Sequence, residues 1–249
     1  MKKKLETVTL LGIDCVDLDR LILAMDICQE KFEFADVKIL SSIKSDNKNV
    51  VPIEPINSVE EYSRFVISEL DNYVETPHVL MVQYDGFILN PESWSDEFLN
   101  YDYIGAPWVV NDFFINHFHF PKELFGKAVV GNGGFSLRSK KMTSLCAKLA
   151  KENAFSRYHP EDLVLCVYDR KLIEDNGIQF ASPEVAKNFS FENDDSEREY
   201  WDGELGFHGF KWTDISRWLE KHPEYVLDSE LSVLEKYKCG SKKCKKIIK

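Results

Sequence analysis

The segment Val79–Phe87 constrains the fold most, because an apolar run typical of a buried strand ends abruptly at Asp85, which is followed by Gly86. In α/β sheets, ligands bind at the edge where the parallel strands end. A carboxylate at that edge is placed to hold a hard divalent ion against a substrate phosphate. Asp-Gly is also a common turn pair, so this segment alone leaves both a metal site and a simple turn open.

The chain before Asp85 alternates between strand-like and helix-like segments. Residues 5–12 and 37–40 have β character, and apolar residues from Leu18 to Phe32 are spaced by three and four, as on one face of a helix. Asn57 or Ser58, followed by Glu61, predicts a capped helix directly before the strand that ends at Asp85. This alternation predicts an α/β fold with a mostly parallel, Rossmann-like twisted sheet flanked by helices.

The regularity weakens after Asp85. Residues 110–125 form an aromatic-rich segment, which we expect to be a functional loop. β character returns at residues 129–138, Ser139 can cap a helix that runs to Lys151, and Pro160 opens a helix that ends at Asn176 and Gly177. Without a repeat or flexible linker, the pattern predicts one domain over residues 1–235 and a basic tail over residues 236–249.

Charge and cysteine usage restrict the partners and the compartment. The net charge of −11 gives nucleic acid no general electrostatic attraction. The tail carries seven lysines from Lys236 to Lys249, which predicts a solvated segment, with contact to an anionic membrane surface as the alternative. Six scattered cysteines and the lack of a leader or membrane span predict a soluble, cytoplasmic protein. Cys239 and Cys244 are weak evidence for zinc or a redox pair.

Three further segments carry groups that could perform chemistry. Asn-Gly within Gly131–Gly134 predicts a hairpin, and the extra glycines also suit a loop that approaches a ligand. Glu161 and Asp162 lie in the first turn of a helix, which stabilises carboxylates and also suits an ionised general base. His208 lies between glycines and aromatic residues, either as a structural histidine or as a metal ligand.

Five segments in this order resemble a domain-of-unknown-function family classed with the glycosyltransferases of the glycosyltransferase A (GT-A) fold. The resemblance runs from about Ser58 to Phe210, and it is carried by Gln83–Phe87, Tyr101–Trp108, Val130–Ser139, His159–Asp162 and Phe207–Gly209. It implies a single domain of that fold, with an antiparallel portion after the metal-binding strand.

The resemblance also implies a reaction. A sugar would pass from a nucleotide-diphosphate sugar to a hydroxyl of a glycan, a lipid-linked acceptor or a protein, with inversion and with help from Mn²⁺ or Mg²⁺. Asp85 matches the second acid of the family's Asp-Xaa-Asp metal motif, His208 matches a histidine that contacts metal or diphosphate, and Asp162 matches the base. Gln83 replaces the first acid, which makes metal dependence a question.

Binding roles follow from the same match. The residues expected to contact the donor are Gln83, Gly86, Gly131, Asn132, Gly133, Gly134 and Arg64, with Tyr62 near the nucleotide. Those expected to contact the acceptor are Glu161, Trp108 and Trp212. Two other classes stay open, because a fold alone does not select a reaction: a nucleotidyltransferase or nucleotide-sugar hydrolase, and a non-catalytic nucleotide or sugar binding module.

Overall fold

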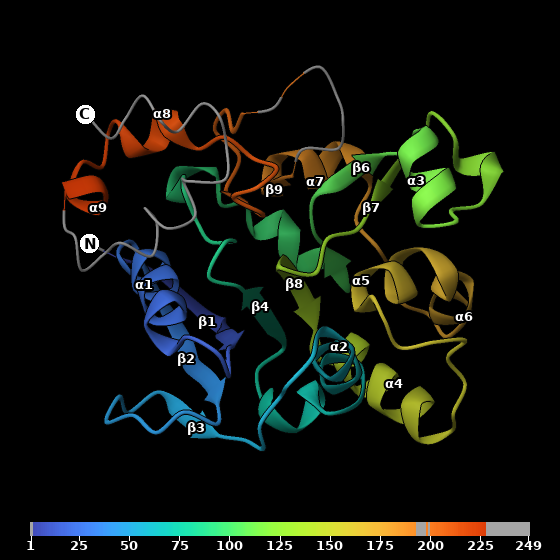
Figure 1. Cartoon of the computed structure of the whole chain (residues 1–249), viewed down its shortest axis with the longest axis horizontal. Helices are drawn as coiled ribbons and strands as arrows, with labels where there is room; N and C mark the ends of the chain where they lie inside the picture. Colours follow the sequence, from blue (N-terminus) through green and yellow to red (C-terminus); the bar gives the residue numbers. More distant parts are fainter. Residues whose placement is uncertain (1, 193–197, 199, 228–249) are drawn as a thin grey trace.

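A computed structural model describes residues 2–192, 198 and 200–227 of the chain (Figure 1). The basic tail over residues 236–249, with Cys239 and Cys244, lies outside the described residues. What the sequence predicts for the tail and for the domain boundary at residue 235 therefore stays a prediction.

A six-stranded sheet in the order β3-β2-β1-β4-β8-β5 forms the centre of the fold (Figure 1). Its strands are β1 (Lys3–Ile13), β2 (Phe32–Ser41), β3 (Val50–Pro52), β4 (His78–Val82), β5 (Tyr103–Ile104) and β8 (Phe135–Ser139). β1, β2, β3 and β4 run parallel, whereas β8 runs antiparallel to β4 and β5. This confirms the predicted mostly parallel sheet with an antiparallel portion, and it brings the ends of β1, β2 and β4 to the same edge as the start of β8.

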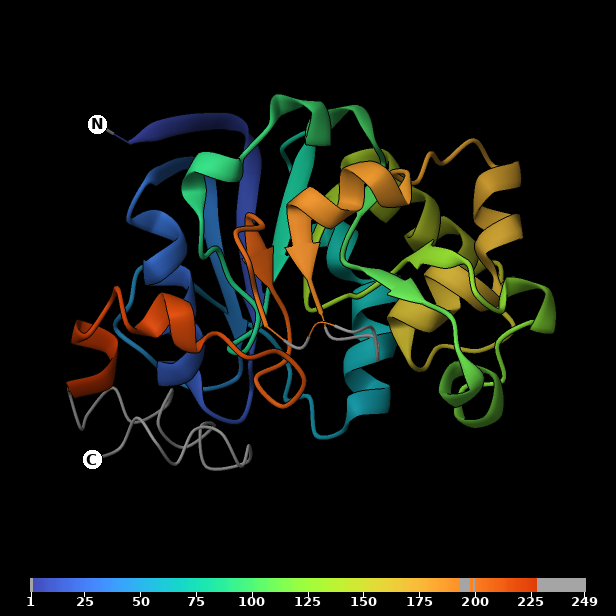
Figure 2. The same ribbon diagram turned by 90° about the horizontal axis from the view of Figure 1, so that it is seen from above.

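Apolar residues on alternate positions of the strands cover both faces of the sheet. Leu10 and Leu80 pack with α1 (Leu18–Gln29) on one face, and Leu11 and Met81 pack with α2 (Val59–Ser68) on the other. Figure 2 shows α1 and α2 on opposite sides of the strands. Two buried faces explain why the strands read as continuous apolar runs in the sequence.

The predicted helix caps are present. Ser58 Oγ accepts the Glu61 N–H at 3.1 Å, and a Glu61 carboxylate oxygen accepts the Asn57 N–H at 2.7 Å. Ser139 Oγ accepts the Met142 N–H at 3.0 Å and starts α4 (Lys140–Lys151). These caps satisfy N–H groups that have no partner within the helix.

The helical segment after Pro160 consists of three consecutive pieces. They are α5 (Glu161–Leu163), the π-helical turn η5 (Val164–Tyr168) and α6 (Arg170–Asp175), and the segment ends at Asn176 and Gly177 as predicted. The remaining helices and 3-10 turns are η1 (Leu70–Tyr73), η2 (Pro91–Ser93), η3 (Asp96–Asn100), α3 (Asp112–His117), η4 (Lys122–Leu124), α7 (Pro183–Phe189), α8 (Ser216–Leu219) and α9 (Glu224–Leu227).

Two small strand pairs complete the fold. β6 (Pro107–Val109) pairs antiparallel with β7 (Ala128–Val130), and β9 (Ser190–Phe191) pairs in parallel with β10 (Gly206–Phe207). The hairpin predicted around Gly131–Gly134 is therefore wrong, because β7 pairs with β6 while β8 pairs with β4 in the main sheet. The residues expected to form an aromatic loop, 110–125, contain α3 and pack their own apolar cluster with Trp108.

Cys28, Cys146 and Cys166 are buried, as is typical of cysteines that pack as small hydrophobic residues. None of the helices within the described residues has both the length and the apolar character needed to cross a membrane.

Candidate functional site

Asp85 lies just past the end of β4, at the edge where the parallel strands stop. A tight turn forms there because Gln83 and Gly86 exchange backbone hydrogen bonds at 3.2 and 3.0 Å. The Asp85 carbonyl also accepts the Gly209 N–H at 2.7 Å, which ties this turn to the segment that carries His208. Two sequence segments predicted to share a site are thus joined through the backbone.

His208 is held on both ring nitrogens. Nδ1 lies 2.8 Å from Glu192 Oε1, and Nε2 lies 3.1 Å from Gln83 Oε1 and 3.7 Å from Asp85 Oδ1. Burial lowers the pKa of His208, but the negative charge of Asp85 and the hydrogen bond to Glu192 outweigh it and raise that pKa to about 9. The imidazole therefore faces two carboxylates and one amide oxygen.

Glu192 lies outside the five sequence segments that carry the family resemblance, so it was not predicted as a site residue. The parallel pairing of β9 with β10 sets Phe191 beside Phe207, so the next residue on each strand, Glu192 and His208, come together. Burial raises the pKa of Glu192, but its hydrogen bond to His208 and the nearby charge of that histidine bring it below the ordinary value. Glu192 is therefore an anion beside the predicted metal ligand.

The acidic pair at the start of α5 divides into a buried member and a partly exposed one. Glu161 is 7% exposed, and its Oε1 lies 3.6 Å from Nη2 of Arg138, which is itself 2% exposed. Asp162 keeps more exposure, and its Oδ1 accepts the Leu163 N–H at 2.8 Å. Burial together with the charges of Glu161 and Glu192 raises the pKa of Asp162 to about 7. Asp162 is thus the member with both access and basicity near neutral pH.

The glycine loop is packed against these side chains. A Cβ at Gly134 would lie 2.1 Å from His208 Nε2, and a Cβ at Gly133 would lie 2.1 Å from Glu161 Oε1. Gly86 and Gly131 likewise lie against His208 and the Trp108 ring. Asn132 adopts a φ of 59°, and its Nδ2 lies 2.8 Å from His208 Nδ1. Only glycine leaves room for this convergence at positions 133 and 134.

A cavity of about 430 Å³ adjoins Gln83 at the carboxyl ends of β1 and β4. Its lining includes Tyr62, whose hydroxyl accepts a hydrogen bond from Gln83 Nε2 at 2.9 Å. The lining also includes Arg20, which donates to Asp14 at 2.6 Å and whose guanidinium lies 3.9 Å from the centre of the Tyr84 ring. Asp14, Arg20 and Tyr84 are not among the site residues predicted from the sequence. The sequence does contain a signal for Asp14, because this aspartate directly follows β1 and Asp85 likewise follows β4.

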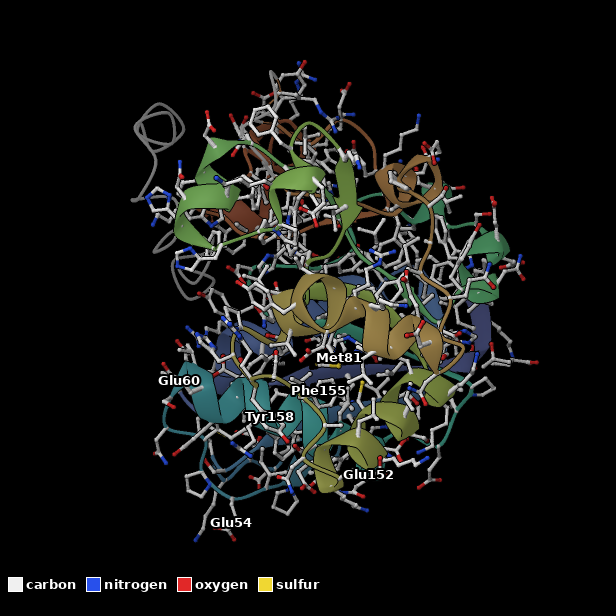
Figure 3. The ribbon with its side chains drawn as sticks, turned by 90° about the vertical axis from the view of Figure 1, so that its right-hand side faces the viewer. Glu54, Glu60, Met81, Glu152, Phe155 and Tyr158 are labelled. Carbon is white, nitrogen blue, oxygen red and sulfur yellow. The ribbon has the colours of Figure 1, made fainter. Side chains whose placement is uncertain are left out.

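The remaining predicted residues lie at three different places. Trp108 is buried, and its Nε1 donates to Glu192 Oε2 at 2.6 Å. Trp212 is 49% exposed beside Gly209. Arg64 does not join the cluster, because its guanidinium stacks 4.0 Å from the Tyr158 ring in a separate cavity between α2 and α4. Figure 3 shows Tyr158 alongside α2, on the side of the molecule that carries Glu54 and Glu60.

The donor set around Asp85 fits a divalent ion that is shared with substrate. Asp85 Oδ1 is buried and has no hydrogen-bond partner in the part of the chain that the structure describes, and His208 Nε2 and Gln83 Oε1 lie on the same side. The described residues contain no group of three or more His, Cys, Asp or Glu placed to hold a metal. One carboxylate, one imidazole and one amide oxygen leave coordination positions for phosphate oxygens, as Mg²⁺ sites commonly do.

Residues 47–208 match the family described as "Protein of unknown function (DUF5672)", and this range covers more than half of the chain. It contains Asp85, the glycine loop, Asp162, Glu192 and His208. No curated protein matches the chain.

Three solved structures are similar to the chain at low identity. The bifunctional IspDF from Campylobacter jejuni is 12% identical over 72% of this chain and 50% of its own, with a TM-score of 0.37. The mannosyltransferase PcManGT from Pyrobaculum calidifontis, in complex with GDP-Man and Mn²⁺, is 12% identical over 72% and 55%, with a TM-score of 0.41. The apo-form glycosyltransferase GlyE of Streptococcus pneumoniae TIGR4 is 13% identical over 95% and 63%, with a TM-score of 0.43. The chain thus spans half to less than two thirds of the length of these proteins.

Proposed function

This chain belongs to the DUF5672 family of proteins of unknown function, and we propose that it is a glycosyltransferase that moves a sugar from a nucleotide-diphosphate sugar to a hydroxyl acceptor with inversion. The observation that carries the proposal is the buried Asp85 oxygen, which has no hydrogen-bond partner among the described residues and faces His208 at 3.7 Å beside the partly exposed Asp162. Such a transfer requires one group that holds a cation next to the departing diphosphate and a second group that takes the proton of the attacking hydroxyl.

The residues around Gln83 and Asp85 would bind the nucleotide-diphosphate sugar and the metal ion. The cavity beside Gln83, whose lining includes Arg20, Tyr62 and Tyr84, would take the nucleoside. The diphosphate would then lie next to Asp85. Asp85 and His208, with Gln83 as a neutral oxygen donor, would hold a Mn²⁺ or Mg²⁺ ion, which neutralises negative charge on the departing diphosphate.

Asp162 supplies the base. Its carboxylate would take the proton from the acceptor hydroxyl as that oxygen attacks the anomeric carbon and the bond to the diphosphate oxygen breaks. Glu161 is committed to Arg138 and to the glycine loop, so it supports this reaction through its charge on Asp162. The half-exposed Trp212 offers the acceptor an aromatic face.

A thermal-shift screen of nucleoside diphosphates and their sugars tests the proposal. We expect one nucleotide to raise the Tm, and to raise it further when Mn²⁺ is added. A ligand at a hundredfold excess over its Kd stabilises the native state by about 2.7 kcal/mol, which is readily detected. Sugar transfer to an added hydroxyl acceptor must follow with the same nucleotide. Release of pyrophosphate would identify a nucleotidyltransferase, and binding that ignores Mn²⁺ without donor consumption would identify a binding module.

The pH dependence of kcat/KM gives a second test. Because the pKa of Asp162 is raised to about 7, the base is ionised only above that pH. We expect kcat/KM to rise about tenfold per pH unit below pH 7 and to level off above it, as for a single ionisation. A profile that is flat from about pH 5 to 8, measured with a verified donor and acceptor, would contradict the assignment of Asp162.

A further inference from the structure

Glu192 joins His208 to Trp108. One carboxylate oxygen lies 2.8 Å from His208 Nδ1, and the other accepts the Trp108 Nε1–H at 2.6 Å. A carboxylate offers only acceptors, so Nδ1 donates its proton to Glu192. Nε2 shares its own proton with Gln83 Oε1 at 3.1 Å, and it is therefore the nitrogen that can exchange a proton for a cation while Nδ1 keeps its hydrogen. Nε2 is the nitrogen that lies 3.7 Å from Asp85 Oδ1.

Asn132 adds a constraint on the same nitrogen. Its Oδ1 accepts the Phe135 N–H at 3.0 Å, so the amide cannot flip without losing that bond, and its Nδ2 donor lies 2.8 Å from His208 Nδ1. The same NH₂ group also hydrogen-bonds Glu192, so Asn132 offers Nδ1 no acceptor, and Glu192 is the group that keeps the proton there.

From this geometry we propose that Glu192 is a positioning residue that holds His208 in the form whose Nε2 can bind a divalent ion, and that Trp108 fixes the orientation of Glu192. This inference rests on the metal role given to Asp85 and His208 in the proposed function. Carboxylates that accept from metal-binding histidines typically contribute about 10- to 100-fold to metal affinity. Glu192 needs no contact with substrate for this role.

Glu192→Gln tests the proposal, because the orientation of the new amide decides whether His208 Nδ1 faces an acceptor or a donor. Trp108 Nε1–H can only donate, so it draws the amide oxygen of Gln to itself and leaves the NH₂ group toward His208 Nδ1. With Asn132 on its other side, Nδ1 would then meet two donors and must accept, which moves the proton to Nε2. We expect Mn²⁺ affinity to fall about 10- to 100-fold. The measurement is titration of the full chain with Mn²⁺ alone, followed by the loss of the electron paramagnetic resonance signal of the free ion.

A second substitution should reverse the loss. In the double variant Trp108→Phe with Glu192→Gln, the donor to the amide is gone, so the amide can rotate and present its oxygen to His208 Nδ1. We expect this variant to recover most of the lost Mn²⁺ affinity, whereas Trp108→Phe alone should change it less than the Gln variant does. Recovery on adding a second lesion is the opposite of what a purely structural role predicts.

Trp94→Phe is the matched control. Trp94 is also buried, and its Nε1 donates to a carboxylate oxygen of Asp96 at 2.7 Å near the start of β1, at the opposite edge of the sheet. It should bind Mn²⁺ like the unmodified chain. Unchanged Mn²⁺ affinity in Glu192→Gln would overturn the role of Glu192 but not the metal role of Asp85 and His208. The same holds if the double variant binds Mn²⁺ as weakly as Glu192→Gln does. An unmodified chain that binds no Mn²⁺ would overturn the metal role as well.

Discussion

Asp162→Asn is expected to lower kcat by about 10² to 10⁴, the usual contribution of a general base. The amide has the size of the carboxylate but cannot take the proton of the acceptor hydroxyl. The loss should appear in kcat at saturating donor and acceptor, with donor affinity little changed, and the rise of kcat/KM toward pH 7 should disappear. Asp175→Asn, a 60% exposed aspartate on α6, is the matched control and should keep full turnover.

The same variant should be more stable than the unmodified chain at alkaline pH. The pKa of Asp162 is raised from 3.8 to about 7 in the folded protein, so ionisation costs stability, and this cost grows as the pH rises through that range. Asparagine removes the cost. We expect a higher Tm than that of the unmodified chain at about pH 8 and an equal Tm at about pH 4. Lost turnover with a lower Tm at both pH values would instead indicate damage to the fold.

Asp85→Asn is expected to lower kcat by about 10² to 10³, which is typical when a group that stabilises charge in the transition state is removed. The neutral amide brings no negative charge to hold a divalent ion beside His208. Turnover should be measured at rising Mn²⁺ concentration, because weaker metal binding predicts a partial recovery at high Mn²⁺. Full turnover with unchanged Mn²⁺ dependence would remove Asp85 from the reaction.

Two further variants sharpen this test. Gln83→Glu restores the first acid of the metal motif and should tighten Mn²⁺ binding, because a second carboxylate adds charge to a site that now has one. Asp202→Asn, at an aspartate that is 57% exposed and pairs with Arg217, should leave Mn²⁺ binding as it is. Equal affinity in Gln83→Glu and the unmodified chain would place the ion, if one binds, away from position 83.

The sequence predicts the fold wherever local signals decide it. Ser58 and Ser139 cap the helices that they were expected to cap, because a cap depends only on residues within one turn. The hairpin at Gly131–Gly134 was predicted wrongly for the opposite reason. Asn132 does adopt the left-handed conformation that Asn-Gly favours, but the partners of the flanking strands are chosen by contacts far along the chain, such as Phe135 with Val82.

The site shows the same division. The family resemblance pointed to Asp85, Asp162 and His208, which the structure brings into one region. Glu192 lies in no motif and reaches His208 only through the pairing of β9 with β10. Arg64 is separated from Tyr62 for a helical reason: residues two apart on a helix do not share a face, so Tyr62 turns toward Gln83 while Arg64 turns toward Tyr158.

The pairing of Val109 on β6 with Ala128 on β7 has a consequence for how such a protein can diversify. The chain leaves this strand pair after Val109 and returns to it at Ala128, so residues 110–127 form a connection whose two ends are held side by side. Lengthening such a connection costs little free energy, because loop closure depends only weakly on length. Insertions into this connection can therefore change the surface that it presents without shifting the paired strands that hold its ends.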